Sequence, residues 1–344
     1  MNVGIVYDPI YLEHDTGTHP ENAARLTSIM TSLQKSQLLP LLTALSPGPA
    51  TFDQLRLVHD ARHIDFIKQT AAAGGGFMDS DTPVSPASYQ AAVYAVGGTI
   101  TAAEAVMQNR LESAFALVRP PGHHALPNQA MGFCLFNNVA IAAEYLLTKY
   151  KLERLAVVDF DVHHGNGTQA AFYSNPKVLY ISTHQSPLYP GTGALEETGS
   201  GKAKGTTINI PLPSGCTDAE YRTAYEQIVV PSIRRFRPQF ILVSAGYDAH
   251  WADHIASMQV TVKGFIYLVE NLKMLAAEMC QKRLVMVLEG GYNLEALAAS
   301  VKATFEVLLG NQNIETPQES PPITRPPPDI RLLIHHIREI HKLT

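Results

Sequence analysis

Two short segments of the chain place imidazole and carboxylate groups at close spacing. Asp159, Asp161 and His163 occupy every second position of DFDVHHGNG, and His123 and His124 follow Arg-Pro-Pro-Gly. Successive side chains of a strand point to opposite faces, so three alternate residues would project toward one side at a strand end. Two carboxylates this close are costly unless a cation or a proton neutralises them. The spacing therefore predicts a metal site.

Asp248 follows another strand-like run and can supply a second carboxylate from a separate strand end. Two aspartates and one histidine leave a position open for water, which is typical of a catalytic metal site. Without a thiolate, the set suits Zn²⁺ but would also accept Fe²⁺ or Mn²⁺. Two anionic ligands cancel the charge of a divalent ion, so its bound water would be only mildly acidified and would need a base.

The adjacent His123 and His124 can supply that base if Asp159 and Asn166 accept hydrogen bonds that orient them. Tyr292 follows two glycines and would place a phenol donor where an oxyanion forms. Each motif alone has a plainer interpretation: a satisfied loop histidine, a turn, or a hydrogen-bonded cap. Their occurrence at four strand ends favours catalysis.

The elements that must position these residues alternate between short apolar runs and longer helical patterns. Runs without polar alternation predict strands buried on both faces, here Val3–Tyr7, Phe115–Val118, Leu155–Phe160, Val178–Thr183, Thr207–Ile210, Phe240–Ser244 and Leu284–Leu288. Helices are predicted over Pro86–Gln108 with Ser85 as N-cap, Asn137–Lys149, Asp218–Arg235, Lys263–Cys280 and Leu294–Leu309. This is an α/β fold with a mostly parallel sheet, whose ligands bind outside the carboxyl ends of the strands.

Composition fits a large core and excludes several classes of function. Only 17% of the 344 residues are charged, and the net charge is −5. The mild acidity argues against direct nucleic-acid binding and leaves basic partners open. Three widely spaced cysteines give no disulfide framework, which fits a reducing compartment. No leader-like or membrane-spanning run is found, so we expect a cytoplasmic protein that does not bind membranes.

The chain is expected to form one domain over residues 1–310, followed by a tail over residues 311–344. The tail first reads as an extended linker with six prolines, namely Pro317, Pro321, Pro322, Pro326, Pro327 and Pro328. Helical spacing then predicts an amphipathic helix, with apolar positions at Ile330, Leu333, Ile334, Ile337 and Ile340. That helix either packs back on its own domain or serves dimerisation or a partner.

The motifs together resemble the zinc-dependent histone deacetylase superfamily, in order and over roughly residues 3–309. They are HDTGTHPENAARL (14–26), RPPGHHA (119–125), GFCLFNNVAIAA (132–143), DFDVHHGNGTQ (159–169), YPGTG (189–193), SAGYDAH (244–250) and EGGYN (289–293). Their wording is closer to class II and bacterial members than to class I. The resemblance implies a single arginase/deacetylase-like domain that hydrolyses acetyl amides.

Residue by residue, the resemblance implies that Asp161, His163 and Asp248 bind zinc. His123 and His124 would be the tandem histidines, paired with Asp159 and Asn166, and Tyr292 would donate to the oxyanion. The asparagine at 166 is the class II form and makes His124 a less strongly assisted base than a class I aspartate would.

The resemblance also implies an acyl-lysine channel and a site for K⁺ or Na⁺. Gly132 and Phe133 would line the channel opposite Tyr189, and Asp81 would lie on its rim. The monovalent cation would bind around a set of strand-end residues, namely Asp159, Asp161, His163, Ser182 and Thr183.

Position 255, seven residues after Asp248, is expected to influence which substrate is bound. Polyamine deacetylases of the superfamily carry there a glutamate that attracts a second amine, whereas this chain has Ile255 in the channel. An acetylated protein or peptide is therefore favoured, with small acetylated amines as the alternative.

The sequence gives less support to three other functions. A catalytically silent acetyl-lysine scaffold is opposed by the completeness of the motif set. A binuclear manganese ureohydrolase would need further aspartate ligands, but Ala249 and His250 follow Asp248. A dehydrogenase is not supported, because Gly74–Gly76 follows no strand and lacks the dinucleotide-binding spacing. A homo-oligomer stays open.

Overall fold

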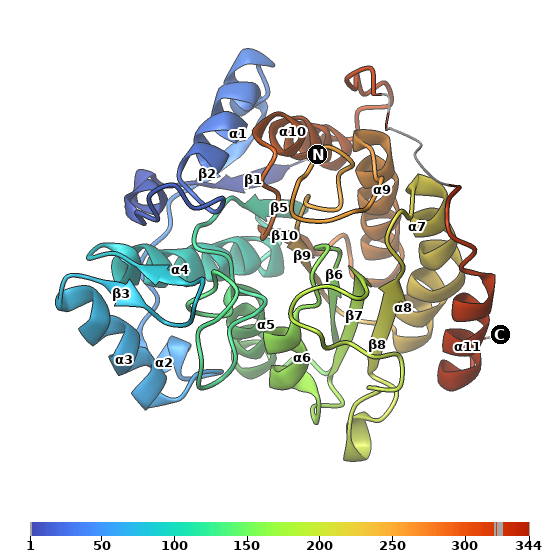
Figure 1. The fold of residues 1–344 in the computed structure, drawn as a ribbon, viewed down its shortest axis with the longest axis horizontal. Helices are drawn as coiled ribbons and strands as arrows, with labels where there is room; N and C mark the ends of the chain where they lie inside the picture. Colours follow the sequence, from blue (N-terminus) through green and yellow to red (C-terminus); the bar gives the residue numbers. More distant parts are fainter. Residues whose placement is uncertain (1, 320, 322–325, 344) are drawn as a thin grey trace.

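The computed structural model of the protein describes residues 2–319, 321 and 326–343. Eight parallel strands form the main sheet in the order β2-β1-β5-β10-β9-β6-β7-β8, through the middle of the molecule (Figure 1). They are β1 (Val3–Val6), β2 (Thr43–Leu45), β5 (Ser113–Ala116), β6 (Leu155–Asp159), β7 (Val178–Gln185), β8 (Thr207–Leu212), β9 (Ile241–Ala245) and β10 (Leu284–Leu288). A short antiparallel pair joins β3 (Gly76–Phe77) to β4 (Pro83–Val84).

Helices cover both faces of the sheet, which confirms the predicted α/β fold. The α-helices are α1 (Ala24–Lys35), α2 (Phe52–Leu55), α3 (Ala61–Ala72), α4 (Ser88–Met107), α5 (Asn138–Lys149), α6 (Asn166–Phe172), α7 (Asp218–Ala224), α8 (Val230–Phe236), α9 (Val262–Met279), α10 (Leu294–Leu309) and α11 (Arg331–His341). Three 3-10 turns are η1 (Pro9–Glu13), η2 (Leu39–Leu41) and η3 (Gly201–Ala203), and η4 (Tyr225–Val229) is a π-helical turn. One layer pairs α4 with α5, and the other packs α1 on α10 and α10 on α9.

The strands that carry the candidate site are neighbours in the middle of the sheet. β5, β10, β9 and β6 lie side by side, and every residue in them is buried. Unbroken apolar strands are expected where helices cover both faces of a parallel sheet. Because the four strands are parallel, their carboxyl ends meet at one edge, and the polar motifs that follow them converge there.

Two of the sequence-based assignments were wrong in detail, and several elements, β2 among them, were not predicted. β2 was missed because it is a three-residue, largely solvent-exposed edge strand. Ser85 is not the N-cap of α4: the cap is Ala87, and the Ser88 hydroxyl accepts a hydrogen bond from the Ser85 amide. The helix expected over 218–235 is divided by η4, where the hydrogen-bond period widens, a change that apolar spacing does not reveal.

The C-terminal helix α11 packs back on its own chain, against η4 and β8 (Figure 1). Ile330, Ile334 and Ile337 are buried there, whereas Ile340 is 39% exposed. The buried face continues to His341 rather than Ile340, because residues 334, 337 and 341 are spaced by three and four positions. Of the six prolines before the helix, Pro322 lies outside the described residues, and the other five lie outside any helix or strand. The division at residue 310 stays a prediction.

No helix within residues 2–319 and 326–343 combines the length and the apolar character that crossing a bilayer requires.

The packing of α11 can be tested with two isoleucines one turn apart. Ile337→Ala should lower the free energy of unfolding by about 2–3 kcal/mol, because it leaves a cavity under the helix. Ile340→Ala should change it by less than about 0.5 kcal/mol, because that side chain is partly in water. Urea denaturation measures both. Equally small effects would show that α11 does not contribute to folding through this face.

Candidate active site

Asp161, His163 and Asp248 meet at the carboxyl edge of the sheet. Each offers a ligand atom, and these atoms all lie within 4.8 Å of one another. His163 Nδ1 is 3.1 Å from Asp161 Oδ1 and 3.2 Å from Asp248 Oδ2. β6 ends at Asp159, and residues 161–163 form a turn in which Asp161 Oδ1 accepts from the His163 amide. The alternation argument grouped Asp159 with Asp161 and His163, but Asp159 contacts His123 instead, and a turn rather than the strand brings Asp161 and His163 together.

The cluster fits a divalent cation. Backbone amides already hold one oxygen of each carboxylate: Val162 donates to Asp248 Oδ1 and Gly290 to Asp161 Oδ2. A Cβ atom at Gly290 would lie 2.2 Å from Asp248 Oδ2, so only glycine allows the backbone this close. Two carboxylates and one imidazole, buried and aimed at a common point, are a donor set for Zn²⁺ or Fe²⁺.

Charge crowding in this cluster shows in its protonation. Burial disfavours charge on His163, yet hydrogen bonds to Asp161 and Asp248 raise the pKa of His163 to about 9. Burial and the neighbouring Asp161 raise the pKa of Asp248 to about 6. Without a cation, the carboxylates thus hold a proton on the imidazole. A metal ion would take the proton's place, because a histidine ligand must be neutral.

The tandem histidines are oriented as predicted but differ in charge. His123 Nδ1 lies 3.1 Å from Asp159 Oδ2, and His124 Nδ1 lies 2.8 Å from Asn166 Oδ1. Burial opposes charge on His123, but Asp161 and Asp159 raise its pKa to about 10. Burial and the two neighbouring histidines lower the pKa of His124 well below 6.5. One ring is therefore a cation and the other a neutral acceptor.

Two further residues, which the sequence did not single out, hold the backbone of His123 and its partner Asp159. The carboxylate of Glu289 accepts hydrogen bonds from the amides of Gly122 and His123, at 2.7 and 3.2 Å. The Tyr180 hydroxyl donates to Asp159 Oδ2 at 3.1 Å. Glu289 directly follows β10 and belongs to the EGGYN motif, but the motif alone did not predict this supporting contact. Tyr180 lies inside β7, where nothing in the sequence distinguishes it from a core residue.

Tyr292 is held on two sides. Asp253 Oδ2 accepts from the Tyr292 amide at 2.6 Å. The buried guanidinium of Arg25 lies 4.9 Å from the centre of the Tyr292 ring and donates to the carbonyl oxygens of Glu289 and Gly291. Burial raises the pKa of the Tyr292 phenol well above 10, so it stays a proton donor.

Glu21 balances the buried positive charge behind Tyr292. It pairs with Arg25 at 3.1 Å and, through both carboxylate oxygens, with Arg119 at 2.6 and 2.9 Å. Burial alone would raise the pKa of Glu21, but Arg119 and Arg25 hold it at about 2. Such a pair is costly to break, because one buried charge would lose its partner.

A pocket of about 350 Å³ leads from the surface to the histidines. All five predicted channel residues line it, namely Asp81, Gly132, Phe133, Tyr189 and Ile255. The Phe133 ring meets Tyr292 edge to face at 5.9 Å, and the His124 ring meets Tyr189 at 5.1 Å. A larger hollow of about 1090 Å³ lies beside the proline segment, and among the described residues that line it Asp218 is the one titratable group.

The rim of the pocket carries residues that were not predicted. Asp79, Ser80 and Leu188 also line it, and His19 Nε2 lies 3.2 Å from Asp81 Oδ1. Asp79 and Ser80 precede Asp81 in a turn between β3 and β4, which carries no motif.

The five residues expected around a monovalent cation lie at and just after the end of β6 and inside β7. Asp159 pairs with Ser182 across the two strands, and the Thr183 hydroxyl lies 3.5 Å from the Asp159 carbonyl oxygen. All five residues are buried. This arrangement brings the named residues together, and the K⁺ or Na⁺ site stays a prediction.

Gly290 gives a test of the metal cluster that leaves its ligands in place. Gly290→Ala should weaken zinc affinity by about tenfold or more, because the added methyl displaces the Asp248 and Asp161 carboxylates. Gly48→Ala is the matched control, since a Cβ there meets no atom within 4 Å. Competition with a chromophoric chelator measures the affinity. An unchanged affinity in Gly290→Ala would contradict the proposed ligand set.

Comparison with known proteins gives one consistent result. A family model described as "Histone deacetylase domain" matches residues 19–308. Among curated relatives, "Histone deacetylase 14, chloroplastic" of Arabidopsis thaliana is 39% identical over 96% of this chain and 83% of its own length. "Histone deacetylase-like amidohydrolase" of Pseudomonas aeruginosa is 41% identical over 85% of this chain and 76% of its own.

The fold agrees with these relatives. A crystal structure titled "Crystal Structure of HDA15 HD domain" superposes with a TM-score of 0.90 at 34% identity, covering 99% of this chain and 94% of that one. The resemblance drawn from the motifs is thereby confirmed: the chain belongs to the histone deacetylase family and is a hydrolytic deacetylase.

Proposed function

We propose that this deacetylase removes acetyl groups from lysine side chains of proteins or peptides, using Zn²⁺ held by Asp161, His163 and Asp248. The observation that carries the proposal is the lining of the pocket, which combines the aromatic rings of Phe133 and Tyr189 with His123, His124, His163 and Tyr292. The aromatic walls of Phe133 and Tyr189 suit the apolar stem of an acyl-lysine, whose amide would then reach the polar end.

A bound divalent cation supplies two things at such a site: it polarises the acyl carbonyl and makes a water molecule more acidic. The family is generally zinc-dependent, and Fe²⁺ stays an alternative that the same ligands would accept.

His124 is suited to accept the proton of the attacking water. Its Nδ1–H donates to Asn166 Oδ1, which leaves the Nε2 lone pair free. The Asn166 amide is itself oriented, because its Nδ2 donates to the sulfur of Met131 at 3.4 Å. A neutral imidazole with a fixed ring can take a proton without first losing one.

His123 and Tyr292 are suited to the charge that develops on the substrate. His123 donates from Nδ1 to Asp159, which orients its ring beside the reacting amide. The Tyr292 phenol can donate to the oxyanion, and its backbone is fixed by Asp253. One of the two histidines then protonates the leaving amine.

Ile255 favours a lysine side chain over a small polyamine. Its apolar side chain lines the pocket and offers no charge to a second ammonium group. Asp79 and Asp81 at the rim would attract a basic substrate of either kind, so they do not discriminate. Deacetylation of small acetylated amines is therefore the second candidate, and a silent acetyl-lysine scaffold is opposed by the complete set of oriented groups.

The cellular compartment and the oligomeric state remain proposals. Cytoplasmic location was expected, whereas two similar plant proteins are named chloroplastic. A homo-oligomer is compatible with the chain, and no partner is assigned.

Release of acetate from an acetyl-lysine peptide tests the proposed roles. His124→Ala and Tyr292→Phe should each lower kcat by about a hundredfold or more, because they remove the base and the oxyanion donor. Leu332→Ala is the control, since that side chain is 65% exposed on α11. Turnover unchanged in either site variant would refute the role assigned to that residue.

Substrate class is tested by comparing acetyl-lysine peptides with acetylated polyamines on the zinc-loaded protein. We expect a higher kcat/KM for the peptides, and an Ile255→Glu variant that shifts preference toward polyamines. A clear polyamine preference of the unaltered chain would overturn the interpretation of Ile255.

A further inference from the structure

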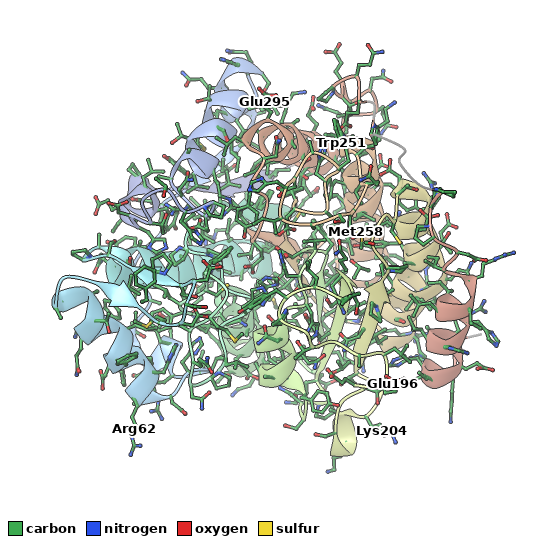
Figure 2. The ribbon with its side chains drawn as sticks, viewed as in Figure 1. Arg62, Glu196, Lys204, Trp251, Met258 and Glu295 are labelled. Atoms are coloured by element: carbon green, nitrogen blue, oxygen red, sulfur yellow. The ribbon has the colours of Figure 1, made fainter. Side chains whose placement is uncertain are left out.

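The segment that follows α10 inserts one carboxylate into the loop beside the metal cluster. Glu319 Oε1 accepts from His250 Nε2 at 2.6 Å and from the Trp251 indole at 3.0 Å, and its Oε2 accepts from the Val262 amide at 2.9 Å. The Glu319 side chain is only 10% exposed. Trp251 is labelled near this segment in Figure 2.

The geometry of His250 makes this contact directional. The Ala252 amide donates to His250 Nδ1 at 3.1 Å, so the ring hydrogen is on Nε2 and points at Glu319. The His250 ring also stacks on Phe265 of α9, with an interplanar angle of 9°. Three donors, two in the loop at 250–251 and one at the start of α9, thus converge on one carboxylate that is far from them in sequence.

The same loop holds the oxyanion donor. Only two residues beyond Trp251, Asp253 Oδ2 accepts from the amides of Tyr292 and Asn293, at 2.6 and 3.0 Å. Asn293 in turn donates from its side chain to the Ala252 carbonyl. Asp253 Oδ1 accepts from the Ile255 amide, and Ile255 lines the pocket. A single turn of chain therefore links the C-terminal tail to both Tyr292 and the channel wall.

We propose that Glu319 is a positioning residue of the active site: it fixes the His250–Asp253 turn and, through Asp253, the backbone of Tyr292. The inference rests on the proposed function, because it assigns Tyr292 a part in the reaction. If Glu319 has this role, the segment after α10 contributes to catalysis and does not only connect α11 to the rest of the protein.

A tether and a positioning contact differ in what their loss changes. Loss of a tether lowers stability and leaves the turnover of the folded enzyme intact. Loss of a positioning contact lowers kcat of enzyme that is still folded and metal-loaded, because a small misplacement of a reacting group is costly. Either loss alters the surroundings of Trp251, the single tryptophan of the chain, so its emission reports the contact and kcat distinguishes the two roles.

The experiment compares Glu319→Ala and Glu319→Gln with Glu315→Ala, whose exposed side chain lies four residues earlier in the same segment. In the full-length, zinc-loaded protein, Glu319→Ala should move Trp251 emission to longer wavelength and lower kcat roughly tenfold, with a smaller change in KM and unchanged zinc content. Glu319→Gln keeps an oxygen for His250 and Trp251, so it should restore the emission and most of kcat. Glu315→Ala should behave as the unaltered protein.

Two results would overturn the proposal. One is a Glu319→Ala enzyme with shifted emission and unchanged kcat, which would make Glu319 a tether only. The other is unchanged emission, which would show that Glu319 does not contact Trp251. Failure of the proposed function looks different: the unaltered, zinc-loaded protein itself would release no acetate from acetyl-lysine peptides, whatever the Trp251 emission shows.

Discussion

The structure depends on two buried carboxylates that face each other. Asp161 and Asp248 come from different strand ends, and their ligand atoms lie within 4.8 Å of each other. At an effective dielectric constant of about 20, two unit charges at that distance repel by about 3 kcal/mol or more. Neither carboxylate can move away, because the amides of Gly290 and Val162 hold them. A cation between them would relieve the repulsion, so this arrangement of carboxylates would favour metal binding at one point.

The order of the strands explains how distant segments meet this constraint. β6 and β9 bring the two aspartates together, and β10, on the far side of β9, adds Gly290 and Tyr292. β5 delivers the tandem histidines from the other side of β10. Each supporting contact is then made across strands, as when Glu289 holds the amides of Gly122 and His123. The candidate catalytic residues therefore lie where four apolar strands, covered by helices, end. The low fraction of charged residues reflects the size of the core that these strands and helices form.

The residues that the sequence singles out lie at one edge of the sheet because most of them directly follow apolar strands. Parallel strands end at one edge, so Asp161, Asp248, His124 and Tyr292 were expected at that edge. They meet there because β5, β10, β9 and β6 are neighbours in the sheet. The sequence did not predict how the side chains are placed within the turns. Asp161 and His163 meet through a turn and not through strand alternation.

The supporting residues could not be found in the same way. Arg25, Asp253 and Glu319 each act through two or three hydrogen bonds to segments far away in the chain, and such contacts leave no local periodicity. The division of the helix at η4 also leaves no signal in the sequence. A π turn keeps the apolar pattern while it changes the hydrogen-bonding period of the backbone.

The most direct test of this account is a zinc titration of the metal-free protein, with acetate release from an acetyl-lysine peptide as the signal. The account predicts that turnover rises in proportion to added Zn²⁺ and levels off at one ion per chain, and that Asp248→Ala abolishes the rise. Full turnover in the chelator-treated protein, or an unchanged titration in Asp248→Ala, would contradict it.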